Sequence, residues 1–144
     1  MSLQTHAHPH LQSLRGYFEG LKPDDVPHMG RHYDKHAYFR DPFNEVRGLP
    51  QVQRIFAHMF ETLEAPRFIV RDAFAEGDQA FLTWDFQFTA RGKAMQIHGS
   101  SHLKFAPDGK VKYHRDYWDA AEELWERVPL LGSLLRFLKK RLRA

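Results

Sequence analysis

The stretch that decides the fold is Ala37-Tyr38-Phe39-Arg40-Asp41-Pro42-Phe43-Asn44-Glu45-Val46-Arg47-Gly48. It begins as a short apolar strand, which Pro42 ends because proline cannot donate a ladder hydrogen bond. Asp41 therefore lies where the strand gives way to a turn, between Phe39 and Phe43. A carboxylate held between aromatic side chains is poorly solvated, which raises its pKa toward the range useful for proton transfer. We expect the rest of the chain to build a pocket around Asp41.

Length and composition indicate one globular domain. The chain has 144 residues, of which 42% are hydrophobic, enough for one core. No apolar run approaches the roughly 20 residues of a membrane-spanning helix. The N-terminus has no apolar signal core, so a cytoplasmic location is expected. The absence of cysteine excludes disulfides and thiolate chemistry, and the 12 phenylalanines favour a Phe-rich core or an apolar ligand cavity.

The positive charge is concentrated at one end of the chain. The formal net charge is +3, but the last eight residues carry four positive charges and no acid. The remainder of the chain is close to neutral and has no basic stripe interleaved with aromatic residues. Nucleic-acid binding is therefore not expected.

Three helices are predicted in the first half of the chain. Apolar residues follow helical spacing from Pro9 or His10 to Leu21, and a second helix is expected from Asp24 or Asp25 to about His36. A third begins near Leu49 and ends before Pro66.

The second half changes to strand periodicity. Four strands are predicted at residues 67–75, 79–90, 94–106 and 110–119, separated by short turns that contain glycine. Consecutive long strands with short turns predict an antiparallel sheet. Helices followed by such a meander indicate an α+β fold, with the helices on one face of a curved sheet.

Alternation along the strands predicts which side chains face the helices. Leu82, Trp84, Phe86 and Phe88 share one face of their strand and are expected to point inward. On the next strand the inward set is Met95, Ile97, Gly99, Ser101, Leu103 and Phe105. On the last strand His114, Asp116 and Trp118 share a face opposite Tyr113, Arg115 and Tyr117, and the pattern leaves open which set points inward.

Three segments follow from these patterns. Residues 1–9 are expected to form a flexible N-terminus, residues 10–119 the domain, and residues 120–144 an amphipathic, basic C-terminal helix. That helix is expected to pack against the protein or a partner subunit, and weak contact with a membrane surface is the alternative.

The order of elements resembles a known family. Residues 33–43 with Arg47-Gly48, residues 103–111 and residues 115–119 carry the resemblance, which spans about residues 14–119. Together they are similar to the cone-shaped fold of the nuclear transport factor 2 superfamily, in its SnoaL-like and ketosteroid isomerase-like branch. The resemblance implies homodimerisation through the convex face of the sheet.

The resemblance also implies a set of catalytic residues. Asp41 falls where the isomerases keep their catalytic base, and Tyr17 where they keep the tyrosine that donates to the oxyanion. Ser101 stands where the isomerases have a protonated aspartic acid as second donor, which puts steroid isomerisation in doubt. Asp116 and His114 are expected to assist, because an Asp–His pair can shuttle a proton. No cofactor or metal is expected.

Two functions from different classes remain open. One is cofactor-free isomerisation or cyclisation of a small apolar carbonyl compound. The other is a non-catalytic binding module for a small apolar ligand or lipid. A third, epoxide hydrolase-like water activation, would use Asp116 with a second aspartate, but Asp85 is expected to point away from the pocket. The expected ligand-binding residues are Phe39, Phe56, Phe60, Trp84, Phe86 and Trp118.

Overall fold

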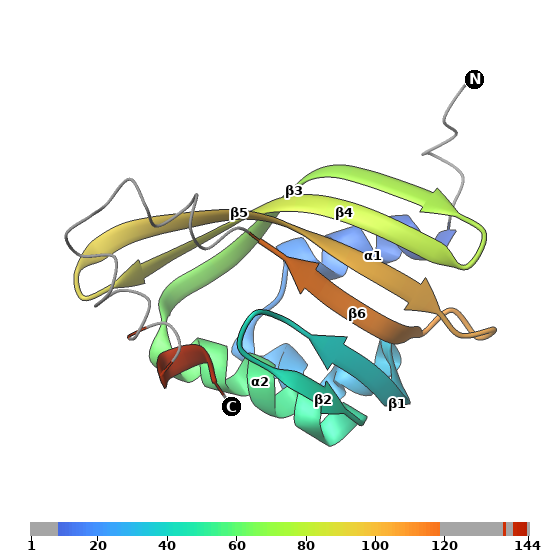
Figure 1. Ribbon diagram of the computed structural model, residues 1–144, viewed down its shortest axis with the longest axis horizontal. Coiled ribbons are helices and arrows are strands. Elements are labelled where there is room, and N and C mark those ends of the chain that lie inside the picture. Colours follow the sequence, from blue (N-terminus) through green and yellow to red (C-terminus); the bar gives the residue numbers. More distant parts are fainter. Residues whose placement is uncertain (1–8, 119–136, 138–139, 144) are drawn as a thin grey trace.

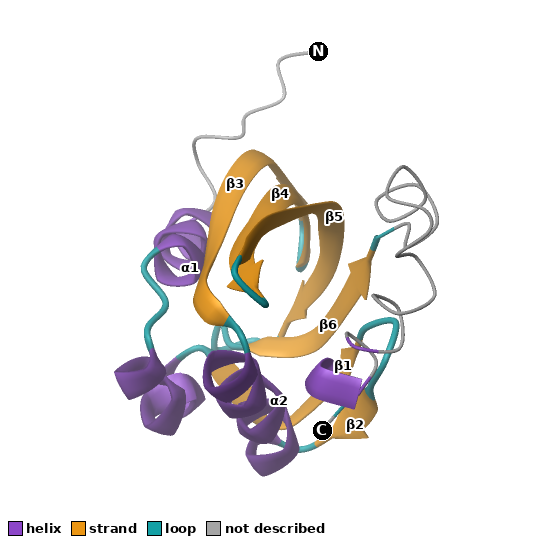
Figure 2. Ribbon diagram, turned by 90° about the vertical axis from the view of Figure 1, so that its left-hand side faces the viewer, coloured by secondary structure: helices purple, strands orange, loops and turns teal. Residues whose placement is uncertain are grey.

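One curved sheet of six strands, with helices closing its open side, makes up the computed structural model, which describes residues 9–118, 137 and 140–143 (Figures 1 and 2). The helical elements are α1 (Pro9–Glu19), η1 (Pro23–Arg31) and α2 (Leu49–Thr62). The strands are β1 (Tyr33–Arg40), β2 (Glu45–Arg47), β3 (Glu64–Glu76), β4 (Gln79–Ala90), β5 (Lys93–Phe105) and β6 (Val111–Tyr117). Their order in the sheet is β2-β1-β6-β5-β4-β3.

The long meander β3–β4–β5–β6 is antiparallel, as predicted. Its turns use the residues that the sequence marked: Arg91 and Gly92 join β4 to β5 with φ values of 51° and 75°. Two successive positive φ angles match the right-handed twist of the strands that they connect. The α+β class of the fold is therefore confirmed.

The second predicted helix is wrong over its last five residues, 32–36. Helix η1 is a 3-10 helix that ends at Arg31, and strand β1 already begins at Tyr33. Pro27 lies inside η1 and cannot donate a helical hydrogen bond. The carbonyl of His32 accepts from the backbone N–H of Val111 at 2.8 Å, so pairing with β6 overrides local helical spacing.

The sheet is mixed rather than purely antiparallel. Strand β1 pairs with β6 in parallel, with Arg40 opposite Arg115. The two strands are neighbours in the sheet although they lie far apart in the sequence. Residues 45–47, for which no strand was predicted, form β2, which pairs antiparallel with β1. The expected arrangement of three regular N-terminal helices is also not matched, because the middle one is a 3-10 helix. Long-range pairing of this kind leaves no local signal in the sequence.

The predicted inward faces of β4 and β5 are both buried. Every member of the two inward sets is buried, from Leu82 to Phe88 and from Met95 to Phe105. The face of β6 that the pattern left open is decided by the fold: His114 is 3% exposed, whereas Tyr117 is 43% exposed. His114, Asp116 and Trp118 therefore look toward the helices.

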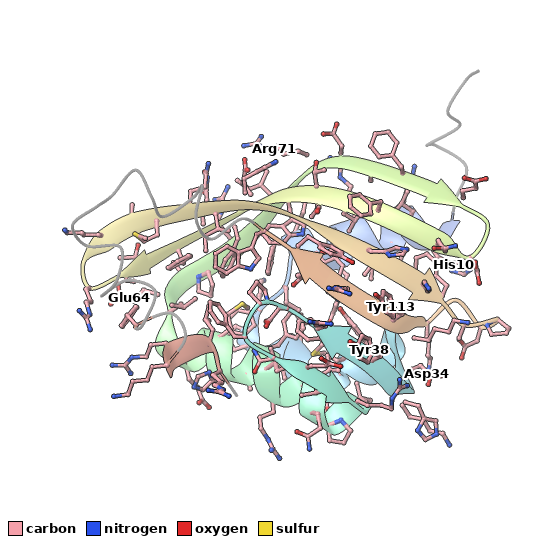
Figure 3. All side chains as sticks on the ribbon, viewed as in Figure 1. His10, Asp34, Tyr38, Glu64, Arg71 and Tyr113 are labelled. Atoms are coloured by element: carbon pink, nitrogen blue, oxygen red, sulfur yellow. The ribbon has the colours of Figure 1, made fainter. Side chains whose placement is uncertain are left out.

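The outer face of the sheet carries aromatic and charged side chains. Phe74, Phe81 and Tyr117 are exposed there. Tyr38 and Tyr113 stack across β1 and β6 with ring centroids 5.3 Å apart, and Arg71 points away from the helices (Figure 3). This is the face through which the homodimer was expected, and that pairing stays a prediction.

The C-terminal helix expected over residues 120–144 lies mostly outside the described residues. Of that segment, residues 140–142 form a helical turn, and Phe137 and Leu142 pack against the core. Across the described ranges, we find no helix with the length and apolar character needed to cross a membrane.

Candidate active site

A partly enclosed apolar cavity lies between the inner face of the sheet and helix α2. Its volume is about 70 Å³, and a cavity of about 20 Å³ adjoins it. Both are lined by Phe56, Phe68, Trp84 and Asp116. The remaining lining residues of the larger cavity are Phe39, Asp41, Phe43, Ile55, Met59, Phe86, Ile97, Trp118 and Leu142. An apolar cavity with a few convergent polar groups is the usual form of a ligand site, and this volume suits a ligand of few atoms.

Five of the six predicted ligand-binding residues line this cavity: Phe39, Phe56, Trp84, Phe86 and Trp118. Phe60 does not, and packs against the core instead. Sequence reasoning missed Phe68 on β3 and Leu142 near the C-terminus. Phe68 opens the continuous apolar run Phe68-Ile69-Val70, in which alternation does not tell the inner face from the outer one.

Asp116 is the polar centre of the site. Its Oδ1 accepts a hydrogen bond from Ser101 Oγ at 2.5 Å and lies 2.6 Å from His114 Nε2. Within the described part of the chain, neither Ser101 nor His114 bonds to Oδ2 of Asp116. Asp116 lines both cavities. One carboxylate oxygen is therefore held by the protein while the group as a whole faces the ligand space.

Hydrogen bonds extend from Asp116 in two directions. On one side Ser101 Oγ accepts from the indole N–H of Trp84 at 2.8 Å. On the other side His114 Nδ1 lies 2.8 Å from the hydroxyl of Tyr33. Ser101, His114 and Tyr33 are all buried, at 3%, 3% and 1% exposure. The fold thus joins Ser101, His114 and Asp116, which the sequence singled out, and adds Tyr33, which sequence reasoning placed in a helix.

The carboxylate of Asp41 organises the turn between β1 and β2. Its Oδ1 accepts from the backbone N–H groups of Phe43 at 2.8 Å and Asn44 at 2.6 Å. The amide of Asn44 donates to both oxygens of Asp41, at 3.2 Å and 3.3 Å, and to the carbonyl of Leu142 at 2.9 Å. Asp41 is half-buried and lines the cavity together with Asp116. It is therefore both a turn former and a wall of the candidate site.

Burial raises the pKa of Asp41 above its ordinary value of 3.8, and the nearby charge of Asp116 raises it further. The hydrogen bonds from Phe43 and Asn44 work in the opposite direction but do not cancel the effect of burial on this pKa. The two carboxylates of the cavity thus differ in environment. Asp41 favours the protonated form more than an exposed aspartate does.

Asp41 also gives a testable pH dependence of stability. A raised folded-state pKa means that the native protein binds the proton more tightly than the unfolded chain. Stability relative to Asp41→Asn should then fall as pH rises from 3.8 through the folded-state pKa.

Asparagine keeps an acceptor for the turn, whereas Asp41→Ala leaves two backbone N–H groups unpaired and should cost about 1–2 kcal/mol. Urea unfolding of the three proteins between pH 4 and pH 8 measures both effects. If the free energy of unfolding of the wild type rises relative to that of Asp41→Asn as pH rises, the raised pKa of Asp41 is contradicted.

Tyr17 is not brought to the cavity, although the resemblance gave it the role of oxyanion donor. Its ring stacks on His32 with centroids 4.0 Å apart, and its buried hydroxyl has no hydrogen-bond partner among the described residues. Burial and the charge of Asp25 raise the pKa of Tyr17 to about 12. The side chain acts here as part of the packing between α1 and η1.

Two further features lie outside the cavity. The carboxylates Asp41 and Asp116 also line an open groove of about 630 Å³, together with Arg40, Arg115 and His98. Asp85 points to the outer face, as predicted, where it accepts from His98 and Arg71; these hydrogen bonds lower its pKa.

Within residues 9–118, 137 and 140–143, no group of three His, Asp or Glu side chains is placed to hold a metal ion.

A curved sheet packed on helices around an apolar cavity, with half-buried carboxylates in the cavity wall, is typical of the class of ketosteroid isomerase-like folds. The sequence profile of the SnoaL-like domain matches residues 14–114, and this chain belongs to that family. No curated protein matches the chain.

Solved structures with the same fold are described in different ways. An LEH-like epoxide hydrolase from M. tuberculosis has a TM-score of 0.70 at 13% identity, and the match covers 88% of this chain and 95% of the hydrolase chain. A proposed SnoaL-like polyketide cyclase from Jannaschia sp. CCS1 has a TM-score of 0.67 at 15% identity, covering 90% and 91%. A protein of Catenulispora acidiphila with a ketosteroid isomerase-like fold, in complex with trimethylamine, has a TM-score of 0.67 at 13% identity, covering 81% and 90%. At these identities the likeness is one of fold.

Proposed function

We propose that the chain catalyses cofactor-free proton transfer, of the isomerase or cyclase type, on a small apolar carbonyl compound bound in the inner cavity. The observation that carries this proposal is the carboxylate of Asp116. Ser101 and His114 hold one of its oxygens, and the residue lines an apolar cavity. A positioned carboxylate beside an apolar cavity is a competent base for a proton next to a carbonyl.

The environments of the two carboxylates suggest their roles. Ser101 and His114 engage Oδ1 of Asp116 and not Oδ2, so we assign Asp116 as the base that removes the proton through Oδ2. Asp41, whose pKa is raised by burial, is the group that donates a proton or hydrogen bond to the developing enolate oxygen. This differs from the expectation from the resemblance, in which Asp41 is the base, Tyr17 and Ser101 are the oxyanion donors, and Asp116 assists. Two titratable groups in one site with different environments commonly divide acid and base work in this way.

Water activation of the epoxide hydrolase type has less support. It would need two aspartates bridged by an arginine at the cavity, and the described lining contains no arginine. Asp85, the second candidate aspartate, is engaged with Arg71 at 2.7 Å on the opposite face of the sheet.

The test is exchange of the α-protons of a small ketone, such as cyclopentanone, for deuterium in D₂O. The signal loss is followed by NMR at increasing protein concentration, with free acetate at matched carboxylate concentration as reference. A protein that accelerates exchange no more than acetate does would refute proton transfer in this cavity for this class of compound. The response of the two aspartate variants is argued in the Discussion.

The lining of the cavity favours one second candidate, a non-catalytic site for a small alkylammonium cation. Seven aromatic rings and two carboxylates face the cavity, and no Lys or Arg is among the described lining residues. Aromatic faces attract a desolvated cation, and a carboxylate neutralises it. The Catenulispora protein with this fold binds such a compound, trimethylamine.

Titration with trimethylammonium chloride at pH 7 tests this candidate. We expect saturable heat by calorimetry, and weaker binding to Asp116→Asn by about tenfold to a hundredfold, because a charged partner is lost. tert-Butanol, which has a similar shape and no charge, serves as the ligand control. Equal binding of the alcohol and the cation would show that only apolar shape is recognised.

A further inference from the structure

Tyr33 is a buried phenol for which the proposed proton transfer has so far no role. It begins strand β1 and is 1% exposed. Its hydroxyl lies 2.8 Å from Nδ1 of His114, and this is its hydrogen bond within the described residues. Burial raises the pKa of Tyr33 well above its ordinary value of 10, so the phenol keeps its proton at neutral pH.

His114 lies between this phenol and Asp116, and hydrogen bonds engage both of its ring nitrogens. Nδ1 faces the Tyr33 hydroxyl at 2.8 Å and Nε2 faces Oδ1 of Asp116 at 2.6 Å. The rest of its surroundings is aromatic, with the ring of Phe39 at 4.8 Å and that of Phe18 edge-on at 5.8 Å. The groups that can exchange protons with the imidazole are thus Tyr33 and Asp116.

Only one assignment of protons satisfies every group in this chain. If Nδ1 carries the proton of a neutral ring, Nε2 presents a lone pair to a carboxylate oxygen, which needs a proton on Asp116. If both nitrogens carry protons, the buried hydroxyl of Tyr33 must accept, and its own proton has no acceptor among the described residues. If Tyr33 donates to Nδ1, then Nε2–H donates to Asp116 and each donor meets an acceptor. A buried polar group without a partner is unfavourable, so the third assignment is preferred.

We propose that Tyr33 is a positioning residue that holds His114 in its Nε2–H tautomer and thereby aims a hydrogen-bond donor at Asp116. The hydroxyl of Ser101 donates to the same oxygen, and the indole N–H of Trp84 donates to that hydroxyl. All four protons of the chain then point toward Oδ1 of Asp116. This leaves Oδ2 as the oxygen presented to a ligand. The effect of Tyr33 on turnover rests on the proposed function, whereas the tautomer does not.

The nitrogen-15 NMR signals of the His114 imidazole test the proposal without any substrate. Wild type and Tyr33→Phe are labelled and compared at pH 7, and the signals are assigned by their loss in His114→Gln. Phe18→Leu is the matched control, because it disturbs a ring packed on His114 and removes no hydrogen bond. We expect an unprotonated Nδ1 and a protonated Nε2 in the wild type and in Phe18→Leu. In Tyr33→Phe, Nδ1 should gain a proton in a measurable fraction of molecules.

Three results decide the outcome. A protonated Nδ1 in the wild type, or an unchanged pattern in folded Tyr33→Phe, overturns the proposal. Should Tyr33→Phe fail to fold, a cross-peak between the wild-type hydroxyl proton of Tyr33 and Nδ1 supports it, and protonated Nδ1 refutes it. In the ketone exchange assay, folded Tyr33→Phe should be slower by about two- to tenfold, the value of one hydrogen bond. Changed NMR signals in a protein without exchange activity would refute the proposed function and leave the tautomer assignment standing.

Discussion

Asp116→Asn is expected to lower the rate of ketone proton exchange by about 10²- to 10⁴-fold, the usual contribution of a positioned general base. Asparagine has the shape of aspartate and keeps an acceptor for Ser101 and His114, so the hydrogen bonds around Oδ1 survive. What disappears is the negative charge and the basic oxygen on the ligand side. The measurement is the exchange rate by NMR, together with a urea unfolding curve that checks the fold.

Asp41→Asn distinguishes the two possible bases. If Asp41 is the donor to the enolate oxygen, its asparagine variant retains a donor and should keep activity within about tenfold of the wild type. If exchange is lost in Asp41→Asn and kept in Asp116→Asn, the base is Asp41, as the family resemblance implied. Asp24→Asn, an exposed position on η1, is the control and should have wild-type activity.

Gly99→Ala is expected to destabilise the protein by about 2–4 kcal/mol, a large effect for one methyl group. A Cβ at Gly99 would lie 2.8 Å from two atoms of the Trp84 ring and closer still to a third, so the indole must move. Trp84 is 6% exposed, and its ring is packed against Phe68 at 5.6 Å. Moving it strains the core and breaks its hydrogen bond to Ser101. Urea unfolding gives the loss of stability, and the indole N–H resonance of Trp84 reports the lost bond.

Gly16→Ala is the matched control for that substitution. Gly16 lies in helix α1, and a Cβ there meets no atom within 4 Å. Alanine has the higher helix propensity, so this variant should gain about 0.5–1 kcal/mol. If Gly99→Ala lowers the free energy of unfolding and Gly16→Ala raises it, the loss at Gly99 comes from the space that Gly99 leaves for the Trp84 ring. A Gly99→Ala protein as stable as the wild type would show that the slot is not needed.

The walls of the site were largely predictable from local pattern. Alternation in β4 and β5 placed Trp84, Phe86 and Ser101 on the buried face, because neighbouring side chains on a strand point to opposite faces of the sheet. It also placed Asp85 outside. The position of Asp41 at the start of a turn was likewise predicted, because Pro42 ends the strand.

The misses share a physical cause. Residues 33–36 were expected in a helix, yet they belong to β1, which pairs in parallel with β6. Strand β6 lies far from β1 in the sequence. The energy of that pairing comes from partners that are distant in sequence, so no window around Tyr33 contains the signal. The same pairing places Tyr33 against His114, whereas Tyr17, which the resemblance had assigned to the site, is not among the residues that line the two cavities.

The sequence by itself determined the α+β class, the antiparallel meander and the inner faces of β4 and β5, because turn residues and strand alternation are local properties. The tertiary structure alone decided that Tyr33, His114, Asp116, Ser101 and Trp84 form one hydrogen-bonded chain. These residues come from β1, β4, β5 and β6. Their distances depend on strand register and sheet curvature, which are set when the whole sheet assembles around its core.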